Sequence, residues 1–259
     1  PPFEPLREFT MQDYQAPKTL LKDKVILVTG AGDGIGKEIA MTFAKYGATI
    51  LLLGRTTAKL ETVYDSIVEA GLPEPAILPV NLEGAVETDY HKIADVIDQE
   101  FGRLDGLVLN ASLLGSMTPI EQYEAEVWQK VMQVNVHANF LLVKTMIPLL
   151  RAADEPSVVF TSSSVGRKGR AFWGAYAVSK FATEGLAQIL ADEHDADDDF
   201  IKFNVINPGA TRTNMRASAY PAENPMSIKA PQDIMPLYLY LMGADSTGVT
   251  GQSLDAQPK

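Results

Sequence analysis

The sequence predicts an α/β fold: a doubly wound parallel sheet of seven strands, with helices on both faces, in a single domain. Short apolar runs rich in β-branched residues alternate with stretches of helical periodicity, which is the pattern of βαβ units. Polar or glycine-rich segments directly follow four of these runs, at Gly30, Asn110, Ser163 and Pro208. In a parallel sheet such segments meet at the carboxyl edge, where ligands bind.

The first predicted strand, Val25–Val28, leads into a glycine-rich turn, Thr29–Gly36, and then a helix over Lys37–Tyr46. This order is the context of a Rossmann-like dinucleotide fingerprint. Its glycines allow a tight turn, close approach of the backbone to a pyrophosphate, and close packing of helix on strand, while the helix N-terminus favours phosphate. The alternative is a flexible loop between ordinary elements. The cofactor contacts expected here are Gly30, Gly32, Asp33, Gly34, Ile35 and Gly36.

The second predicted strand, Thr49–Leu53, bears on the choice of cofactor. NAD sites often place an acid after this strand, on the ribose 2′-hydroxyl, but here Gly54 and Arg55 follow it. Arg55 offers a planar fork suited to a 2′-phosphate. The alternative is that Arg55 is simply solvated. The negative charge of Asp33 nearby would also repel a 2′-phosphate. The sequence therefore favours NADP(H) over NAD(H).

The rest of the chain continues the alternation, without repeats or a linker long enough to divide it. The further predicted strands are Ala76–Val80, a run ending at Leu109, Ser157–Thr161, Ile201–Ile206 and Ser253–Asp255, and the further predicted helices are Thr57–Ala70, Gln122–Leu150, Tyr176–His194 and Pro231–Met242.

Tyr176 and Lys180 lie four residues apart on one predicted helix and therefore share a face. A fixed ammonium favours the phenolate, so we expect Lys180 to lower the pKa of Tyr176 from its ordinary value of about 10. Such pairs also occur by chance on solvated helices. A catalytic role for Tyr176 and Lys180 is favoured here because the chain also contains a predicted cofactor site.

Ordered motifs along residues 21–256 resemble those of the short-chain dehydrogenase/reductases, in their compact branch. The matching segments are Thr29–Gly36, Leu109–Ser112 (for Asn-Asn-Ala-Gly), Asn135, Ser163 (13 positions before the tyrosine), Tyr176–Lys180 and Pro208–Thr213. Phe160–Arg167, Trp173–Tyr176 and the tail Asp255–Pro258 further resemble the bacterial YciK-type oxidoreductases.

The resemblance implies an oxidoreductase that transfers a hydride between NAD(P) and a carbonyl or secondary alcohol. Tyr176 would be the acid/base, Lys180 would hold the nicotinamide ribose, and Ser163 would donate to the substrate oxygen. Asn135 would interrupt its helix to hold a water that passes protons through Lys180. The alternatives are a non-catalytic NADP-binding regulator or redox sensor, and an isomerising enzyme. The remaining cofactor contacts implied are Asn81, Leu82, Asn110, Ala111, Tyr176, Lys180, Pro208, Gly209, Thr211 and Thr213.

Two residues depart from the family pattern: Ser112 stands where glycine is usual, and Asn81 where aspartate is common. Neither touches the expected reacting centre. Candidate substrate contacts follow the strands and precede the tyrosine: Leu113, Leu114, Arg170, Phe172, Trp173, Arg212, Met215 and Arg216. Arg212 and Arg216 could each contact an anionic substrate, the cofactor phosphates or solvent. Trp173 either covers the pocket or packs against a loop.

Composition excludes other classes of function. The formal charge of −11 argues against nucleic acid and anionic membranes as partners, and no run approaches the ~20 apolar residues of a membrane span. Chain-wide absence of cysteine fits a cytoplasmic location. The three histidines lack metal-ligand spacing, so no metal is expected, and Asp192–Asp199 is expected to be a solvated acidic loop.

We divide the chain into an N-terminal extension, 1–20, expected to be partly leader or expression-derived, and a catalytic NAD(P)-binding domain, 21–259. The resemblance also implies a homodimer or homotetramer built on the helices Gln122–Leu150 and Tyr176–His194. Their abundant apolar residues exceed what one sheet contact needs; the alternative is that all of them face their own sheet. The expected partner is otherwise a small carbonyl or alcohol substrate.

Overall fold

The computed structural model describes residues 14–258. It confirms the expected architecture: a parallel sheet of seven strands in the order β3-β2-β1-β4-β5-β6-β7. Chain order reverses beside β1, so the loops after β1 and β4 diverge there and leave room for a ligand. The strands are β1 Val25–Thr29, β2 Thr49–Gly54, β3 Ala76–Pro79, β4 Gly106–Leu109, β5 Ser157–Thr161, β6 Lys202–Asn207 and β7 Ser253–Asp255.

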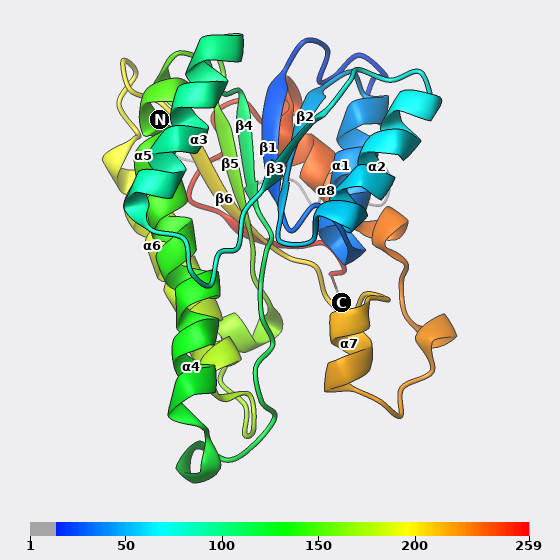
Figure 1. Cartoon of the computed structure of the whole chain (residues 1–259), viewed down its shortest axis with the longest axis vertical. Coiled ribbons are helices and arrows are strands. Elements are labelled where there is room, and N and C mark those ends of the chain that lie inside the picture. Colours follow the sequence, from blue (N-terminus) through cyan, green and yellow to red (C-terminus); the bar gives the residue numbers. More distant parts are fainter. Residues whose placement is uncertain (1–13, 259) are drawn as a thin grey trace.

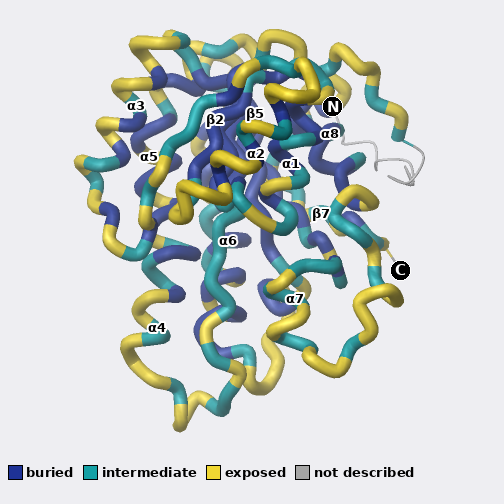
Figure 2. The backbone as a smooth tube through the Cα atoms, turned by 45° about the vertical axis from the view of Figure 1, so that its right-hand side comes forward, coloured by how far each residue is buried: buried dark blue, intermediate teal, exposed yellow. Residues whose placement is uncertain are grey.

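Helices cover both faces of the sheet, as Figure 1 shows. Alternate side chains of β1 point to opposite faces: Val25 and Leu27 join one core cluster, Ile26 and Val28 the other. The first cluster is covered by α3 (Glu87–Phe101), α5 (Ala138–Arg151) and α6 (Gly174–Glu193), and the second by α1 (Gly34–Lys45), α2 (Thr57–Glu69) and α8 (Met235–Met242). Figure 2 shows burial concentrated along the central strands and exposure on the outer helices and loops.

The expected long helix over Gln122–Leu150 is not continuous. It divides into a 3-10 turn, Ile120–Gln122, the helix α4 (Ala125–Met132), one wide π turn, Gln133–His137, and α5. Within the wide turn, Asn135 bonds the backbone of Leu113 and the hydroxyl of Ser179 on α6. Contacts to two other segments therefore accompany the break in helical geometry.

The N-terminal extension expected over 1–20 falls partly outside the described residues, which begin at Tyr14. The described part packs on the domain. Tyr14 donates a hydrogen bond to Asp245 at 2.6 Å and sets its ring edge-on to Tyr240 of α8, 5.5 Å between centroids. Ala16 and Leu20 also pack against the α8 side of the core. Within residues 14–258, no helix combines the length and apolarity that crossing a membrane requires.

Candidate active site

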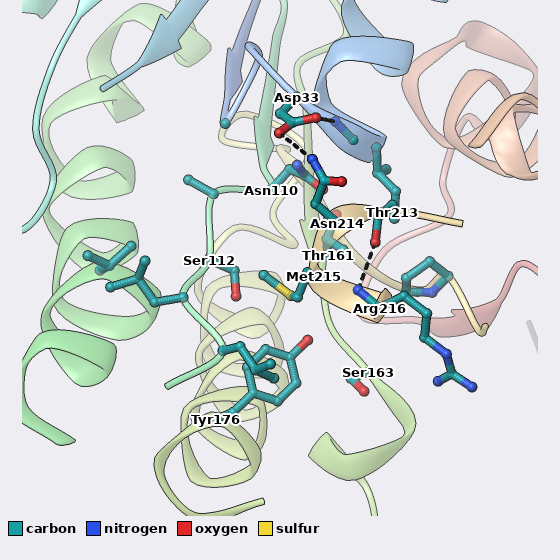
Figure 3. Close-up of a pocket in the computed structure, with 18 of the residues that line it drawn as sticks. Asp33, Asn110, Ser112, Thr161, Ser163, Tyr176, Thr213, Asn214, Met215 and Arg216 are labelled. Atoms are coloured by element: carbon teal, nitrogen blue, oxygen red, sulfur yellow. Dashed lines mark hydrogen bonds between the residues drawn. The ribbon is translucent and has the colours of Figure 1, made fainter. Parts of the chain in front are cut away.

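A cavity of about 450 Å³ lies at the carboxyl edge of the sheet, between the loops that follow β1 to β6. Figure 3 shows the part where the glycine turn faces the short helix α7 (Asn214–Ala219) above Ser163 and Tyr176. Segments far apart in sequence therefore meet in one place. The expected site residues in its wall are Gly30, Gly32, Asp33, Gly34, Ile35, Arg55, Asn81, Leu82, Asn110, Ala111, Leu114, Ser163, Trp173, Tyr176, Lys180, Pro208, Gly209, Thr211, Thr213 and Met215.

The glycine turn has the geometry that its sequence predicts. Gly30 and Gly34 adopt left-handed backbone angles, with φ of +65° and +53°. Residues that carry a Cβ rarely adopt these angles. Gly36 lies behind the cavity wall, where a Cβ would overlap the carbonyl of Gly30 and stand 2.8 Å from Nδ2 of Asn110. The turn and the start of α1 thus leave backbone close to the cavity, which fits a dinucleotide pyrophosphate.

Charged side chains gather at the end of the cavity beside β2. Asp33 accepts hydrogen bonds from the amide of Gly34, from Lys59 Nζ at 2.9 Å and from Asn214, and these bonds, Lys59 first, lower the pKa of its carboxyl. Arg55 pairs with Glu83 at 3.2 Å. Lys59 thus offsets the negative charge of Asp33, and sequence reasoning missed it because the pairing is tertiary.

Tyr176, Lys180 and Ser163 meet at the other end of the cavity. Tyr176 and Lys180 are only 8% and 3% exposed on α6. Lys180 donates to the carbonyl oxygen of Thr161 at 2.9 Å and places its Nζ 5.4 Å from the centre of the Tyr176 ring. Gly166 makes this arrangement fit, because a Cβ there would stand 2.8 Å from the Cβ of Lys180. Sequence reasoning missed the role of Gly166.

The pKa of Tyr176 differs from the sequence-based expectation. Burial raises it to about 12, while the Ser163 hydroxyl opposes the rise. Burial lowers the pKa of Lys180 to about 8, opposed by the charge of Glu184. The expectation that the phenol pKa falls below 10 is therefore wrong, because desolvation outweighs the opposing hydrogen bond with Ser163. At neutral pH the phenol holds its proton.

Asn135 does not line the cavity. Its side chain is fully used: Oδ1 accepts from the amide of Leu113 at 2.8 Å, and Nδ2 donates to the Leu113 carbonyl and to Ser179. Its own carbonyl accepts from Asn139 Nδ2 at 2.9 Å. Asn135 therefore ties the loop after β4, which carries Leu113 and Leu114, to α6.

The expected substrate contacts divide into two groups. Leu113, Leu114, Trp173, Met215 and Arg216 lie in the cavity wall. Arg170, Phe172 and Arg212 do not. Phe172 is exposed at a positive φ of 73°, and Arg212 donates to the carbonyls of Pro225 and Ile228. Across residues 14–258, no group of three or more His, Cys, Asp or Glu side chains is arranged to hold a metal.

The family model described as short chain dehydrogenase matches residues 24–224, and the chain belongs to this family of oxidoreductases. Among its relatives, the uncharacterized oxidoreductase YciK of Escherichia coli strain K12 is 53% identical over 95% of this chain and 96% of its own. A short chain dehydrogenase of Escherichia coli CFT073, solved with NADPH, is 53% identical with a TM-score of 0.91, covering 94% of this chain and all of the other. A short chain dehydrogenase from Shigella flexneri, solved with NADP, gives 52% and 0.90, covering 93% and 100%.

Proposed function

We propose that this chain is an NADP-dependent oxidoreductase that interconverts a carbonyl compound and the corresponding alcohol. The observation that carries the proposal is the meeting of Ser163, Tyr176 and Lys180 in the cavity that the glycine turn closes at its other end. A binding protein has no need of a buried proton donor beside a buried ammonium. This juxtaposition therefore favours catalysis over a regulatory role.

Each residue has a role that its surroundings support. A bound nicotinamide supplies or accepts the hydride. Tyr176 donates its proton to the substrate oxygen during reduction, and its raised pKa keeps that proton in place at neutral pH. Ser163 donates a hydrogen bond to the same oxygen. Lys180 has donors beyond its bond to Thr161 for the ribose hydroxyls.

The remaining assignments concern the cofactor's other parts and the support behind the site. Thr213 and the backbone after Pro208 orient the carboxamide, and the expected contacts at Asn81, Leu82, Asn110 and Ala111 hold the adenosine half. Asn135 does not line the cavity and acts on the site indirectly. It positions the loop after β4, and it takes part in the proton path through Lys180.

NADP is the proposed cofactor for two reasons. The relatives solved with NADP and NADPH are more than 50% identical to this chain. Arg55 and Lys59 bring two cations to the end of the cavity where a 2′-phosphate would lie. Both are paired with carboxylates, but the Arg55 side chain is 63% exposed in its pair with Glu83, so this pair is weak enough to yield to a phosphate.

Tyr176→Phe tests the reaction. Reduction is first established by screening aldehydes, ketosteroid-like ketones and 3-ketoacyl thioesters with NADPH. The variant should bind NADPH within about threefold of the wild type and lose 10²–10⁴-fold in kcat, because only the proton donor is removed. Retention of more than about a tenth of kcat would contradict the assignment, and failure of all three substrate classes with NADPH bound would favour the regulator.

We also propose that the protein is a cytoplasmic homo-oligomer that joins through α5 and α6. Large apolar side chains on these helices are exposed rather than packed on their own sheet: Phe140, Val178, Phe181 and Ile189. Exposed apolar side chains gathered on neighbouring helices favour a self-complementary interface. Light scattering that finds an active species of the monomer mass of 28.2 kDa would remove this part of the proposal.

A further inference from the structure

The wall around the proposed proton donor is apolar. Tyr176 packs in a small cluster with Val165 and Ala177, against which Leu114, Trp173 and Met215 lie. Figure 3 shows Met215 above the Tyr176 ring and Ser163 to the right of Tyr176. The end of the cavity that would receive the substrate is therefore bounded largely by hydrocarbon and aromatic surface. The polar side chains that also line it include those assigned to the reaction, together with Ser112, Ser164 and Arg216.

Arg216 lines the cavity on the α7 side, but its charge is already engaged. Its guanidinium donates two bonds to the carboxylate of Glu223, at 2.7 and 2.6 Å, and stacks 3.8 Å from the centre of the Tyr220 ring. The pair is about three-quarters buried. Such a bidentate pair is a strong one, and breaking it would leave the Glu223 carboxylate without its partner.

Arg212, the other arginine expected to bind an anionic substrate, also has its hydrogen bonds taken up within the protein. Arg212 donates to two backbone carbonyls, those of Pro225 and Ile228, and lies outside the cavity. Both arginines thus hold the segment around α7 in place. Among the described residues that line the substrate end, the cationic side chains are Lys180 and Arg216, and Lys180 is assigned to the ribose.

Trp173 supplies a flat surface beside the reacting position. Its ring lies 5.7 Å from that of Tyr176 and 5.9 Å from that of Tyr220, which follows α7. An aromatic or other flat apolar group that enters between α6 and α7 would contact this ring. A carboxylate there would lose its water and find no unpaired cation, which is costly.

We propose that the substrate is an uncharged, apolar carbonyl compound or alcohol, and that the site rejects carbonyl compounds with a carboxylate or phosphate near the reacting group because Glu223 masks Arg216. This inference rests on the proposed function. It also predicts how to reverse the selectivity: removing the charge of Glu223 frees Arg216 to receive an anion.

The test compares 2-naphthaldehyde with 6-carboxy-2-naphthaldehyde, which differ by one carboxylate, as substrates of the enzyme with NADPH. We expect the wild type to favour the neutral aldehyde in kcat/KM by about 100-fold, and Glu223→Gln to reduce this ratio at least about tenfold by improving use of the carboxylate. Glu100→Gln removes an exposed carboxylate on α3 and should leave the ratio unchanged. A wild-type ratio near one, or no effect of Glu223→Gln, overturns the inference.

A binding experiment separates this inference from the proposed reaction. If neither aldehyde is consumed, the proposed function fails for this class, but the charge preference is still measured with unreactive amides. Calorimetric titration of the enzyme with NADPH should give a Kd for 2-naphthamide about 100-fold below that for 6-carboxy-2-naphthamide. Equal affinities, or no binding of the neutral amide, overturn the inference.

Discussion

Replacing Gly36 by alanine should loosen the junction between β1 and α1 and damage cofactor binding. A Cβ at this position would overlap the Gly30 carbonyl, standing 2.7 Å from its carbon, and would lie 2.8 Å from Nδ2 of Asn110. Carbon atoms in contact normally stand about 3.5–4.0 Å apart, so α1 and the turn must separate by roughly 1 Å. The obstacle is backbone, which cannot rotate out of the way.

Overpacking of this kind costs about 1–3 kcal/mol in unfolding free energy. For a chain of this size the loss lowers Tm by about 2–4 °C per kcal/mol. We expect Gly36→Ala to melt about 2–12 °C below the wild type in calorimetry. Its NADPH affinity should fall at least about tenfold, because the amides that face the pyrophosphate are displaced.

Gly169→Ala is the matched control. A Cβ at Gly169 meets nothing within 4 Å, and its φ is not in the left-handed range, so Tm and NADPH affinity should stay near those of the wild type. The reasoning is refuted if Gly36→Ala melts within about 1 °C of the wild type and binds NADPH within about twofold, since close packing at the turn would then not matter.

Three further predictions concern substitutions of Arg55, Lys202 and Phe181. Arg55→Ala should weaken NADPH by about 1.5–3 kcal/mol and leave NADH nearly unchanged in fluorescence titrations; equal losses would mean that Arg55 does not meet the 2′-phosphate. Burial lowers the folded pKa of Lys202 to about 8 from an ordinary 10.5, so the unfolded chain binds more protons between these values and stability rises with pH. Denaturant titrations at pH 8 and 9.5 should show this rise reduced by about 1.5 kcal/mol in Lys202→Met, and an unreduced rise would show that Lys202 does not titrate there. Phe181→Glu places a charge on the exposed face of α6 and should shift light scattering towards the monomer; an unchanged mass would remove α6 from the interface.

The parts of the site that sequence predicts well are those whose geometry is local. The turn Thr29–Gly36 needs glycine for backbone reasons that its neighbours already specify, and Gly30 and Gly34 adopt the left-handed angles that this implies. Tyr176 and Lys180 share a face because helical spacing alone requires it. The strands are predicted to within a residue or two for the same reason, since each is a short apolar run bounded by polar or glycine residues.

The parts that sequence reasoning missed depend on contacts between distant segments. The partner of Asp33 is Lys59, on the next helix. The resemblance implies that Asn135 interrupts its helix, but the partners of its side chain, Leu113 and Ser179, lie on distant segments that spacing does not reveal. The raised pKa of Tyr176 comes from burial, which spacing does not reveal.

The two ends of the cavity differ in how their charges are held, and this difference separates binding from chemistry. At the cofactor end, Arg55 and Lys59 each form an ion pair with a carboxylate near the surface. Dissolved salt screens such interactions. At the reacting end, Tyr176 and Lys180 are buried, so salt reaches them poorly, while pH changes their protonation. Ionic strength should therefore act mainly on the KM for NADPH, and pH mainly on kcat. If the proposed function is right, salt and pH should therefore affect different kinetic constants of the same cavity.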